Sequence, residues 1–400
     1  MFEIKGKRNT AICYASVIEE EAVEQIRRMC DYEFTEGSRI RIMPDVHAGK
    51  ACTIGTTMTI QDKVVPNIVG VDIGCGMYTV SLGKHEIDFD KLDAAAYFIP
   101  SGMNVWEEPQ EHFALEQLRC YQELKNLSRL EKSLGTLGGG NHFIEIDQAA
   151  DGSKYLVIHS GSRNLGKQVA EFYQRLAIDL NKGKETYLEE REKIIRTYKA
   201  QGRTQEIQAA LDRISWNQRE TSIPEDLCFL YGTDLEDYLH DVEICQQFAR
   251  RNRELMAEIL IDRAGLSCGE CFHTIHNYID TEEMILRKGA IAAHKDEKVL
   301  IPINMRDGSV LAVGKGNEEW NFSAPHGAGR IMSRRVAKSS LSMEEYQETM
   351  KGVYTTSISA STLDEAPMAY KSLNDIIGVI RESVDVIDVM KPIYNFKASD

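Results

Sequence analysis

The stretch Thr53-Ile-Gly-Thr-Thr-Met-Thr-Ile60 and the following Asn67-Ile-Val-Gly-Val71 decide the fold class of this 400-residue chain. Between residues 39 and 82, β-branched and apolar residues alternate with glycine and threonine. This alternation predicts short strands joined by tight turns, with 53–60 and 67–71 among the strands. Polar side chains at the ends of such strands lie where a sheet opens onto a cleft, so we expect the chemistry of the chain there.

Three more strands are expected further along the chain, at residues 155–158, 299–303 and 309–313. Apolar residues recur at three- and four-residue spacing over residues 169–180, which predicts a helix, and residues 235–263 have the pattern of one long amphipathic helix. The sequence therefore predicts an α+β fold, with stacked mixed β-sheets flanked by helices around a central metal cleft.

A charge-rich stretch from residue 183 to 219 is typical of solvated helices. Ile223-Pro224 is its clearest break, because proline disfavours helix at the preceding residue. A length of 400 residues allows either one large core with an insertion or two tightly fused domains, and of these we expect a single catalytic domain over residues 1–400 with a helical insertion at about 182–232.

Composition limits the functional classes. The 47 basic and 62 acidic residues give a net charge of −15, which argues against a broad coat for long nucleic acid but allows a local basic pocket. The charged start and the lack of an apolar run of roughly 20 residues predict a soluble, cytoplasmic protein with no membrane contact. Nine scattered cysteines favour reduced thiols, and the single Cys268-Gly-Glu-Cys271 pair lacks the second pair of a structural zinc site.

Five separated polar segments offer one carboxylate, one thiolate and three imidazoles, a ligand set suited to borderline transition metals, plus a further histidine in a glycine-rich turn. A thiolate beside divalent cations loses its proton readily and can bridge two ions. The segments are Asp72-Ile-Gly-Cys75, Asn141-His142, His159, His276 and His326-Gly-Ala-Gly-Arg330.

Each segment also has a structural interpretation. Asp72 can cap backbone amides while Cys75 is simply buried, and a serine after His159 can cap a helix. His276 has no local glycine signature, and His326 can begin a helix. The coincidence of five such segments in one chain favours the metal-site hypothesis over these alternatives taken together.

Two segments carry arginines suited to anions. Arg163 follows a predicted buried strand at a predicted helix start, which attracts phosphate. Arg330 and Arg334 fall one turn apart if a helix begins after His326.

The glycine run before Asn141 has its own local geometry. Simple alternation puts Asn141 and Glu145 on one side of a strand and His142 on the other, so a bend at the glycines is needed to bring all three together.

In combination these segments resemble the RtcB-type RNA ligase family, and the motifs occur in the order expected from near the start to Lys397. The motifs are Met43-Pro-Asp-Val-His47, Gly70-Val-Asp-Ile-Gly-Cys-Gly76, Gly138-Gly-Gly-Asn-His142, His159-Ser-Gly-Ser-Arg163, Gly232-Thr-Asp-Leu-Glu-Asp-Tyr-Leu239 with Asn252-Arg253, His276-Asn, His326-Gly-Ala-Gly-Arg330 and Asp364-Glu-Ala-Pro-Met-Ala-Tyr-Lys371.

The resemblance implies a GTP- and manganese-dependent ligase that joins an RNA 3′-phosphate or 2′,3′-cyclic phosphate end to a 5′-hydroxyl end. His326 would form a covalent histidine–guanylate and release pyrophosphate. Two Mn²⁺ ions would be held by Asp72, Cys75, His142, His159 and His276. The guanylate would be surrounded by Asn141, Glu145, Gly327, Ala328, Gly329, Tyr370 and Lys397, and phosphates would be contacted by Arg163, Arg330 and Arg334.

The chain departs from the family pattern at three places. A small glycine-serine-methionine-glycine loop is replaced by Ile301-Pro-Ile-Asn-Met-Arg-Asp-Gly308, Gly74 stands where asparagine is commoner, and residues 398–400 extend past Lys397. These departures suggest a divergent paralogue that serves RNA repair instead of tRNA splicing.

Two other functions stay open. One is a metal-dependent phosphodiesterase or cyclic-phosphate hydrolase, and the other is a non-catalytic RNA-end sensor. The expected partners are RNA ends, GTP and, as an open alternative, an activating protein.

Overall fold

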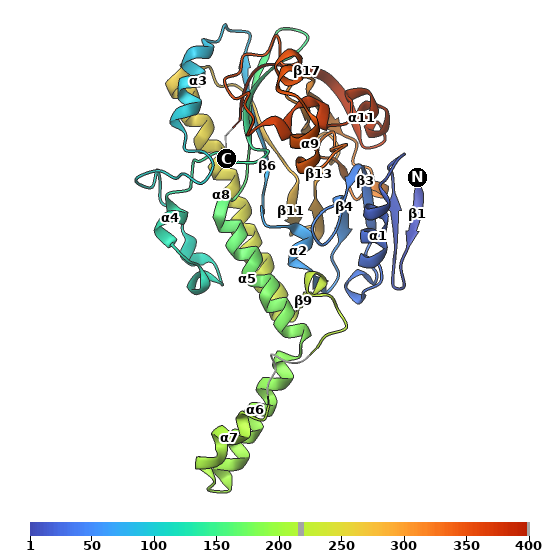
Figure 1. Ribbon diagram of the computed structural model, residues 1–400, viewed down its shortest axis with the longest axis vertical. Coiled ribbons are helices and arrows are strands. Elements are labelled where there is room, and N and C mark those ends of the chain that lie inside the picture. The colour runs from blue at the N-terminus through green and yellow to red at the C-terminus, as the bar shows by residue number, and fades with distance from the viewer. Residues whose placement is uncertain (215–219, 398–400) are drawn as a thin grey trace.

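The computed structural model describes residues 1–214 and 220–397 and shows two larger β-sheets flanked by helices (Figure 1). Neighbouring strands of the six-stranded first sheet run antiparallel, except that β2 and β3 are parallel. Its order is β1 (Phe2–Lys5), β2 (Thr10–Cys13), β3 (Ile40–His47), β4 (Ile54–Thr59), β12 (Ile285–Lys288) and β11 (Asn277–Asp280).

The second sheet has seven antiparallel strands and curls until its two edge strands meet. The backbone N–H of Leu300 on one edge donates to Oγ1 of Thr274 on the other at 3.1 Å, so the sheet forms a nearly closed barrel. Its order is β10 (Cys271–Ile275), β6 (Gly76–Gly83), β8 (Lys154–Ser160), β7 (Phe143–Gln148), β17 (Val384–Lys397), β15 (Gly308–Gly314) and β14 (Lys298–Asn304).

Two short two-stranded ribbons complete the β-structure. The first, β13 (Ala290–Ala292) with β16 (Ser323–Pro325), contacts both larger sheets, and the second, β5 (Lys63–Val64) with β9 (Leu230–Tyr231), packs against the two long helices described next. These sheets and their helices confirm the expected α+β class with stacked mixed sheets.

Two long helices pack side by side against the sheets, α5 (Arg163–Asn181) and α8 (Gly232–Ala264) (Figure 1). Their apolar faces join one core with the six-stranded sheet, whereas the other end of α8 packs with α3 (Phe89–Phe98) on the outside of the barrel. Apart from α6 and α7, which are described next, the other α-helices in the described ranges are α1 (Glu20–Met29), α2 (Pro66–Val69), α4 (Leu127–Glu131), α9 (Arg334–Ser340), α10 (Met343–Thr349) and α11 (Leu373–Ile380).

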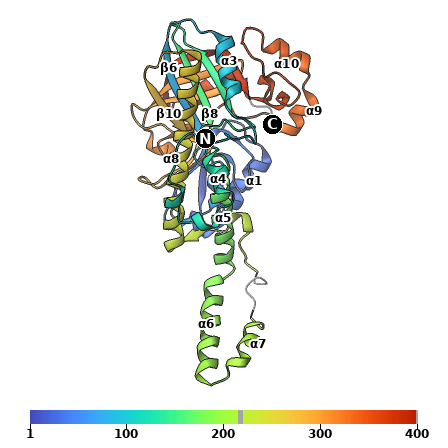
Figure 2. The same ribbon diagram turned by 90° about the vertical axis from the view of Figure 1, so that its left-hand side faces the viewer.

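Beyond α5, helices α6 (Lys184–Ala200) and α7 (Ile207–Leu211) project away from the body as an arm (Figures 1 and 2). Residues 215–219 of the expected helical stretch lie outside the described residues, as does the tail at 398–400. The division into one domain with an insertion at 182–232 stays a prediction. No helix in the described ranges combines the length and apolarity needed to cross a bilayer.

One expected strand is wrong. Residues 67–71 do not form a strand, because Pro66 starts the short helix α2, where the fixed φ of proline suits the first helical position. Gly70, at φ 96°, ends this helix and turns the chain into the loop that carries Asp72. The strands expected at 53–60, 155–158, 299–303 and 309–313 and the helices expected at 169–180 and 235–263 are confirmed.

Candidate active site and metal centre

Four loops and strand ends bring one carboxylate, one thiol and three imidazoles together at the mouth of the barrel. Asp72 and Cys75 occupy the loop between α2 and β6, and the three histidines lie before β7, near the end of β8 and between β10 and β11. The five residues are Asp72, Cys75, His142, His159 and His276.

Cys75 is the centre of this cluster. Its Sγ lies 3.3 Å from Nε2 of His159 and 3.5 Å from Nε2 of His142. His159 Nε2 is 3.4 Å from Nε2 of His276, and His142 Nε2 is 3.1 Å from Oδ2 of Asp72. Two groups of three ligands therefore share the sulfur, Cys75 with His159 and His276, and Cys75 with Asp72 and His142, and each can hold one metal ion.

Backbone carbonyls orient two of the imidazoles. Nδ1 of His142 lies 2.8 Å from the carbonyl oxygen of Leu137, and Nδ1 of His159 lies 3.1 Å from that of Asn141. A carbonyl accepts a hydrogen bond, so each Nδ1 carries the proton and each Nε2 keeps its lone pair toward the cluster.

The electrostatics of the cluster suit metal ligands. Burial lowers the pKa of His159 and of His276 well below the usual range, so both imidazoles are neutral. Burial, and next the charge of Asp72, raise the pKa of the Cys75 thiol. Burial acts most strongly and would raise the pKa of Asp72, but the neighbouring His142, Cys75 and Arg163 together outweigh it and leave that pKa low. A cation bound at Cys75 would lower the pKa of this thiol, because its positive charge stabilises the thiolate.

Helix α8 supports the cluster from behind. The fully buried Arg253 donates to the carbonyl oxygens of Gly74 at 2.7 Å and Ser160 at 2.8 Å. Oδ1 of Asn252 accepts hydrogen bonds from the backbone N–H groups of Gly135 and Thr136, just before the glycine run that leads to His142. These contacts lock the loops that carry Cys75 and His159.

Asp45 is a site residue to which the sequence analysis gave no role. Its Oδ2 lies 2.7 Å from Nδ1 of His326 and 3.2 Å from the backbone nitrogen of the same residue, and the carboxylate is fully buried. The His326 ring also lies against His276, with ring centroids 5.1 Å apart. The motif Met43-Pro-Asp-Val-His47 was visible in the sequence, but nothing in it indicated which histidine Asp45 would meet.

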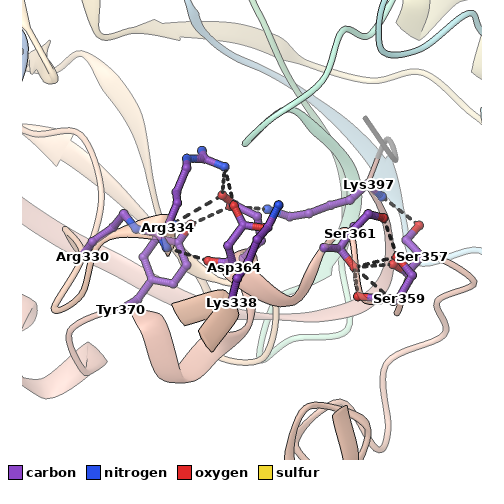
Figure 3. Close-up of polar contacts among 11 residues, drawn as sticks. Arg330, Arg334, Lys338, Ser357, Ser359, Ser361, Asp364, Tyr370 and Lys397 are labelled. Atoms are coloured by element: carbon purple, nitrogen blue, oxygen red, sulfur yellow. Dashed lines mark hydrogen bonds and ion pairs between the residues drawn. The ribbon is translucent and has the colours of Figure 1, made fainter. Parts of the chain in front are cut away.

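A cluster of basic side chains gathers around Asp364 and Glu365 (Figure 3). Arg334 approaches Asp364 at 2.9 Å and Glu365 at 2.7 Å, and Lys397 approaches Glu365 at 2.7 Å. Burial acts to raise the pKa of Glu365, but Lys397 and Arg334 outweigh it and lower the pKa to about 2. The Tyr370 hydroxyl donates to the same carboxylate at 2.6 Å.

Arg330 and Arg334 do not share a helix, which corrects the sequence expectation. Helix α9 starts only at Arg334, where Ser333 caps it by accepting from the backbone N–H of Val336. Arg330 instead pairs with Tyr370 in an isolated β-bridge.

A second expected contact also differs. The serine before Arg163, Ser162, makes no side-chain cap, and the Arg163 guanidinium donates to Oγ1 of Thr136 and the carbonyl oxygen of Gly102.

A cavity of about 350 Å³ connects the ligand set centred on Cys75, His326 and the basic cluster around Asp364 and Glu365. Its walls include most of the residues expected at the site, except His142 and Arg163. The expected residues that line it are Asp72, Cys75, Asn141, Glu145, His159, His276, His326, Gly327, Ala328, Gly329, Arg330, Arg334, Tyr370 and Lys397.

The divergent loop at residues 301–308 forms part of this cavity. Asn304 and Met305 line it, whereas Arg306 and Asp307 pair with each other at 2.7 Å. The charged residues of the loop therefore neutralise one another.

Comparison with known proteins agrees with the order of the motifs. A family model described as tRNA-splicing ligase RtcB matches residues 25–99 and 96–398. The RNA-splicing ligase RtcB of Escherichia coli K12 is 29% identical over 94% of this chain and 94% of its own length. The tRNA-splicing ligase RtcB of Aeropyrum pernix is 26% identical over 84% of this chain and 83% of its own length. These matches extend along nearly the whole chain, which therefore belongs to the RtcB family.

Proposed function

We propose that this protein is a GTP- and Mn²⁺-dependent RNA ligase that joins a 3′-phosphate or 2′,3′-cyclic phosphate end to a 5′-hydroxyl end. The observation that carries the proposal is the position of His326, oriented by Asp45 in the cavity beside the Cys75-centred ligand set. Relatives over most of the chain are named RNA-splicing or tRNA-splicing ligases, which supports the same reaction class.

The ligand set fits the expected ions. One thiol, one carboxylate and three neutral imidazoles suit borderline divalent metals, and the shared sulfur suits a pair of them. We assign two Mn²⁺ ions to Asp72, Cys75, His142, His159 and His276. When bound, such ions neutralise the charge on phosphate oxygens during phosphoryl transfer.

His326 is the proposed nucleophile. Because Asp45 accepts from Nδ1, the proton stays on that nitrogen and Nε2 keeps a lone pair for the α-phosphorus of GTP. The new bond joins Nε2 to phosphorus, and the bond to the leaving oxygen breaks, so pyrophosphate departs with the electron pair. The imidazolium that results is stabilised by the buried Asp45 carboxylate.

The guanylate then passes from His326 to an oxygen of the RNA 3′-phosphate, and attack by the 5′-hydroxyl on that phosphorus releases GMP. We propose that Asn141, Glu145, Tyr370, Lys397 and residues 327–329 contact the nucleotide. Arg330 and Arg334 line the cavity and are assigned to phosphates. An RNA contact for Arg163 stays a prediction, since its guanidinium already donates to Thr136 and Gly102.

The domain organisation, the compartment and the type of RNA substrate are part of the same proposal. We propose one catalytic unit over residues 1–400 with the insertion at 182–232, acting in the cytoplasm on broken RNA ends, in repair more than in tRNA splicing. An activating protein is the further partner to test.

The deciding experiment is mass spectrometry of the intact protein after incubation with GTP and Mn²⁺. We expect a guanylate-sized mass gain that maps to His326 and is absent from His326→Ala. Opening of a 2′,3′-cyclic phosphate without GTP and without an adduct would instead identify a hydrolase. Tight binding of RNA ends with no change in either strand would identify a sensor.

A further inference from the structure

Four oxygen-bearing side chains lie on three neighbouring strands of the barrel, and two of them, Glu145 and Asn395, also line the cavity. Glu145 and Asp147 lie two residues apart on β7 and therefore face the same side. Asn395 on β17 is the register partner of Glu145 and donates to its Oε2 at 2.6 Å. Ser309 on β15, the next strand, completes the group, which we call the oxygen cluster.

The surroundings of the oxygen cluster are apolar. Six strands of the barrel contribute one apolar side chain each to a buried cluster inside it: Met77, Phe143, Val157, Leu300, Leu311 and Met390. Asp147 and Ser309 are 0% exposed and Asn395 is 1% exposed, so water does not solvate their polar atoms from outside. Burial of this kind is costly unless each polar atom has a partner.

Four atoms of the oxygen cluster have no hydrogen-bond partner. They are both carboxylate oxygens of Asp147, Oγ of Ser309 and Oδ1 of Asn395. The side chains of Ser309 and Glu145 lie close enough to Asp147 to act to lower its pKa as weak hydrogen-bonding neighbours, but neither reaches its carboxylate in good hydrogen-bond geometry. Buried polar groups in native proteins are almost always satisfied, so this concentration points to a ligand.

Two neighbouring carboxyl groups in an apolar barrel cannot both be charged without a counter-charge. Burial, followed by the charge of Asp147, raises the pKa of Glu145, and burial raises that of Asp147 to about 6. In the described part of the chain, no basic side chain pairs with Asp147. The charge of Lys397 acts on Glu145, but Lys397 is already paired with Glu365 at 2.7 Å, so a proton or a further cation must accompany the two carboxyl groups.

The unpartnered atoms favour the cation. Three of the four are acceptors only, and a proton shared between two carboxyl groups satisfies a single contact. A cation can accept several oxygen ligands at once, so it offers a partner to more of these atoms than a shared proton does. Carboxylate, amide and hydroxyl oxygens without nitrogen or sulfur are the ligands of hard cations.

We propose that Glu145, Asp147, Ser309 and Asn395 bind one hard divalent cation, Mg²⁺ or Mn²⁺, at a site separate from the Cys75-centred ligand set. The bound cation would hold Glu145 ionised where its side chain lines the cavity. This site does not depend on the proposed ligase reaction, and its test needs no RNA or nucleotide.

The test compares cation binding by the full-length protein and Asp147→Asn, which keeps the shape of the side chain but loses its charge. Manganese bound per chain is counted by electron paramagnetic resonance, and the midpoint of thermal unfolding is followed against added Mg²⁺. We expect the variant to bind one Mn²⁺ fewer than the wild-type chain and to lose the Mg²⁺-dependent rise in midpoint. Asp385→Asn, which removes a carboxylate that is 75% exposed on the same strand as Asn395, should behave as wild type.

The midpoint of thermal unfolding of the metal-free protein tests the proposal in a second way. Without divalent ions, Asp147→Asn should melt no lower than the wild-type chain, because it removes the repulsion with Glu145. Should Asp147→Asn fail to fold, Ser309→Ala replaces it and should weaken Mg²⁺ binding about tenfold. Equal manganese counts in wild type and variant, with Mg²⁺ raising both midpoints alike, would overturn the proposal and indicate a shared proton.

Discussion

Oδ2 of Asp45 lies 2.7 Å from Nδ1 of His326, across 281 residues of sequence. The carboxylate is fully buried, whereas the His326 side chain is 22% exposed to the cavity. The pair therefore fixes one ring nitrogen and leaves the other for chemistry, as in an acid-oriented histidine base or nucleophile.

Asp45→Asn tests this orientation. The amide keeps the size of the side chain but no longer compensates an imidazolium, so we expect the rate of guanylate attachment to His326 to fall about 10²-fold or more. Single-turnover labelling with GTP measures the rate. Asp62→Asn, in which an exposed carboxylate is changed, is the matched control. An unchanged rate in Asp45→Asn would remove Asp45 from the mechanism.

Cys75→Ala tests the shared thiol. Both ligand groups lose the atom they have in common, so we expect transition-metal content measured by elemental analysis to drop for both ions together. Cys271→Ala removes an exposed thiol and should leave the metal content unchanged. Loss of only one ion would show that the sulfur serves a single metal.

Arg253→Met tests the support from α8. The variant keeps much of the side-chain volume but leaves the buried carbonyls of Gly74 and Ser160 without their donor. We expect the free energy of unfolding from urea titration to fall by about 3 kcal/mol, with weaker metal binding as a consequence. Arg250→Met, on the same helix with a side chain that is 63% exposed, should change stability little.

Glu365→Gln tests the acid dependence of stability. The folded-state pKa of Glu365 is about 2, below its ordinary value of 4.5, so the ionised carboxylate stabilises the fold above pH 4.5. That contribution, about 3 kcal/mol at most, is lost as pH falls from 4.5 toward 2. The variant should be less stable at pH 7 and should lose less stability between pH 5 and pH 3 than wild type in urea titrations. Parallel pH profiles would contradict this assignment.

Much of the fold was predictable from local patterns. The alternation at 53–60 and the helical spacing at 235–263 are confirmed because strand and helix periods depend on neighbouring residues. The strand expected at 67–71 failed because Pro66 imposed a helical start on an apolar run that was too short to show a period. The condition for Arg330 and Arg334 to lie one turn apart, a helix beginning after His326, is not met because α9 begins only at Arg334, and spacing alone does not show where a helix begins.

The residue types at the candidate site were also visible in the sequence, because a mixed set of thiol, carboxylate and imidazole groups is uncommon and the family motifs occur in order. The family membership inferred from these motifs is confirmed, and the individual catalytic and nucleotide-binding roles stay predictions. Sequence spacing gave no indication of the contacts of Arg163, which are made to Thr136 and Gly102.

The sequence by itself determined the residue types available at the candidate site, most of the strands and helices, and the family. Only the tertiary structure decided which partners meet, as in Asp45 with His326 and Asn395 with Glu145. The physical reason is that such partners are chosen by strand register and by the closure of the barrel. Both depend on packing between segments hundreds of residues apart, and no local pattern of residues encodes them.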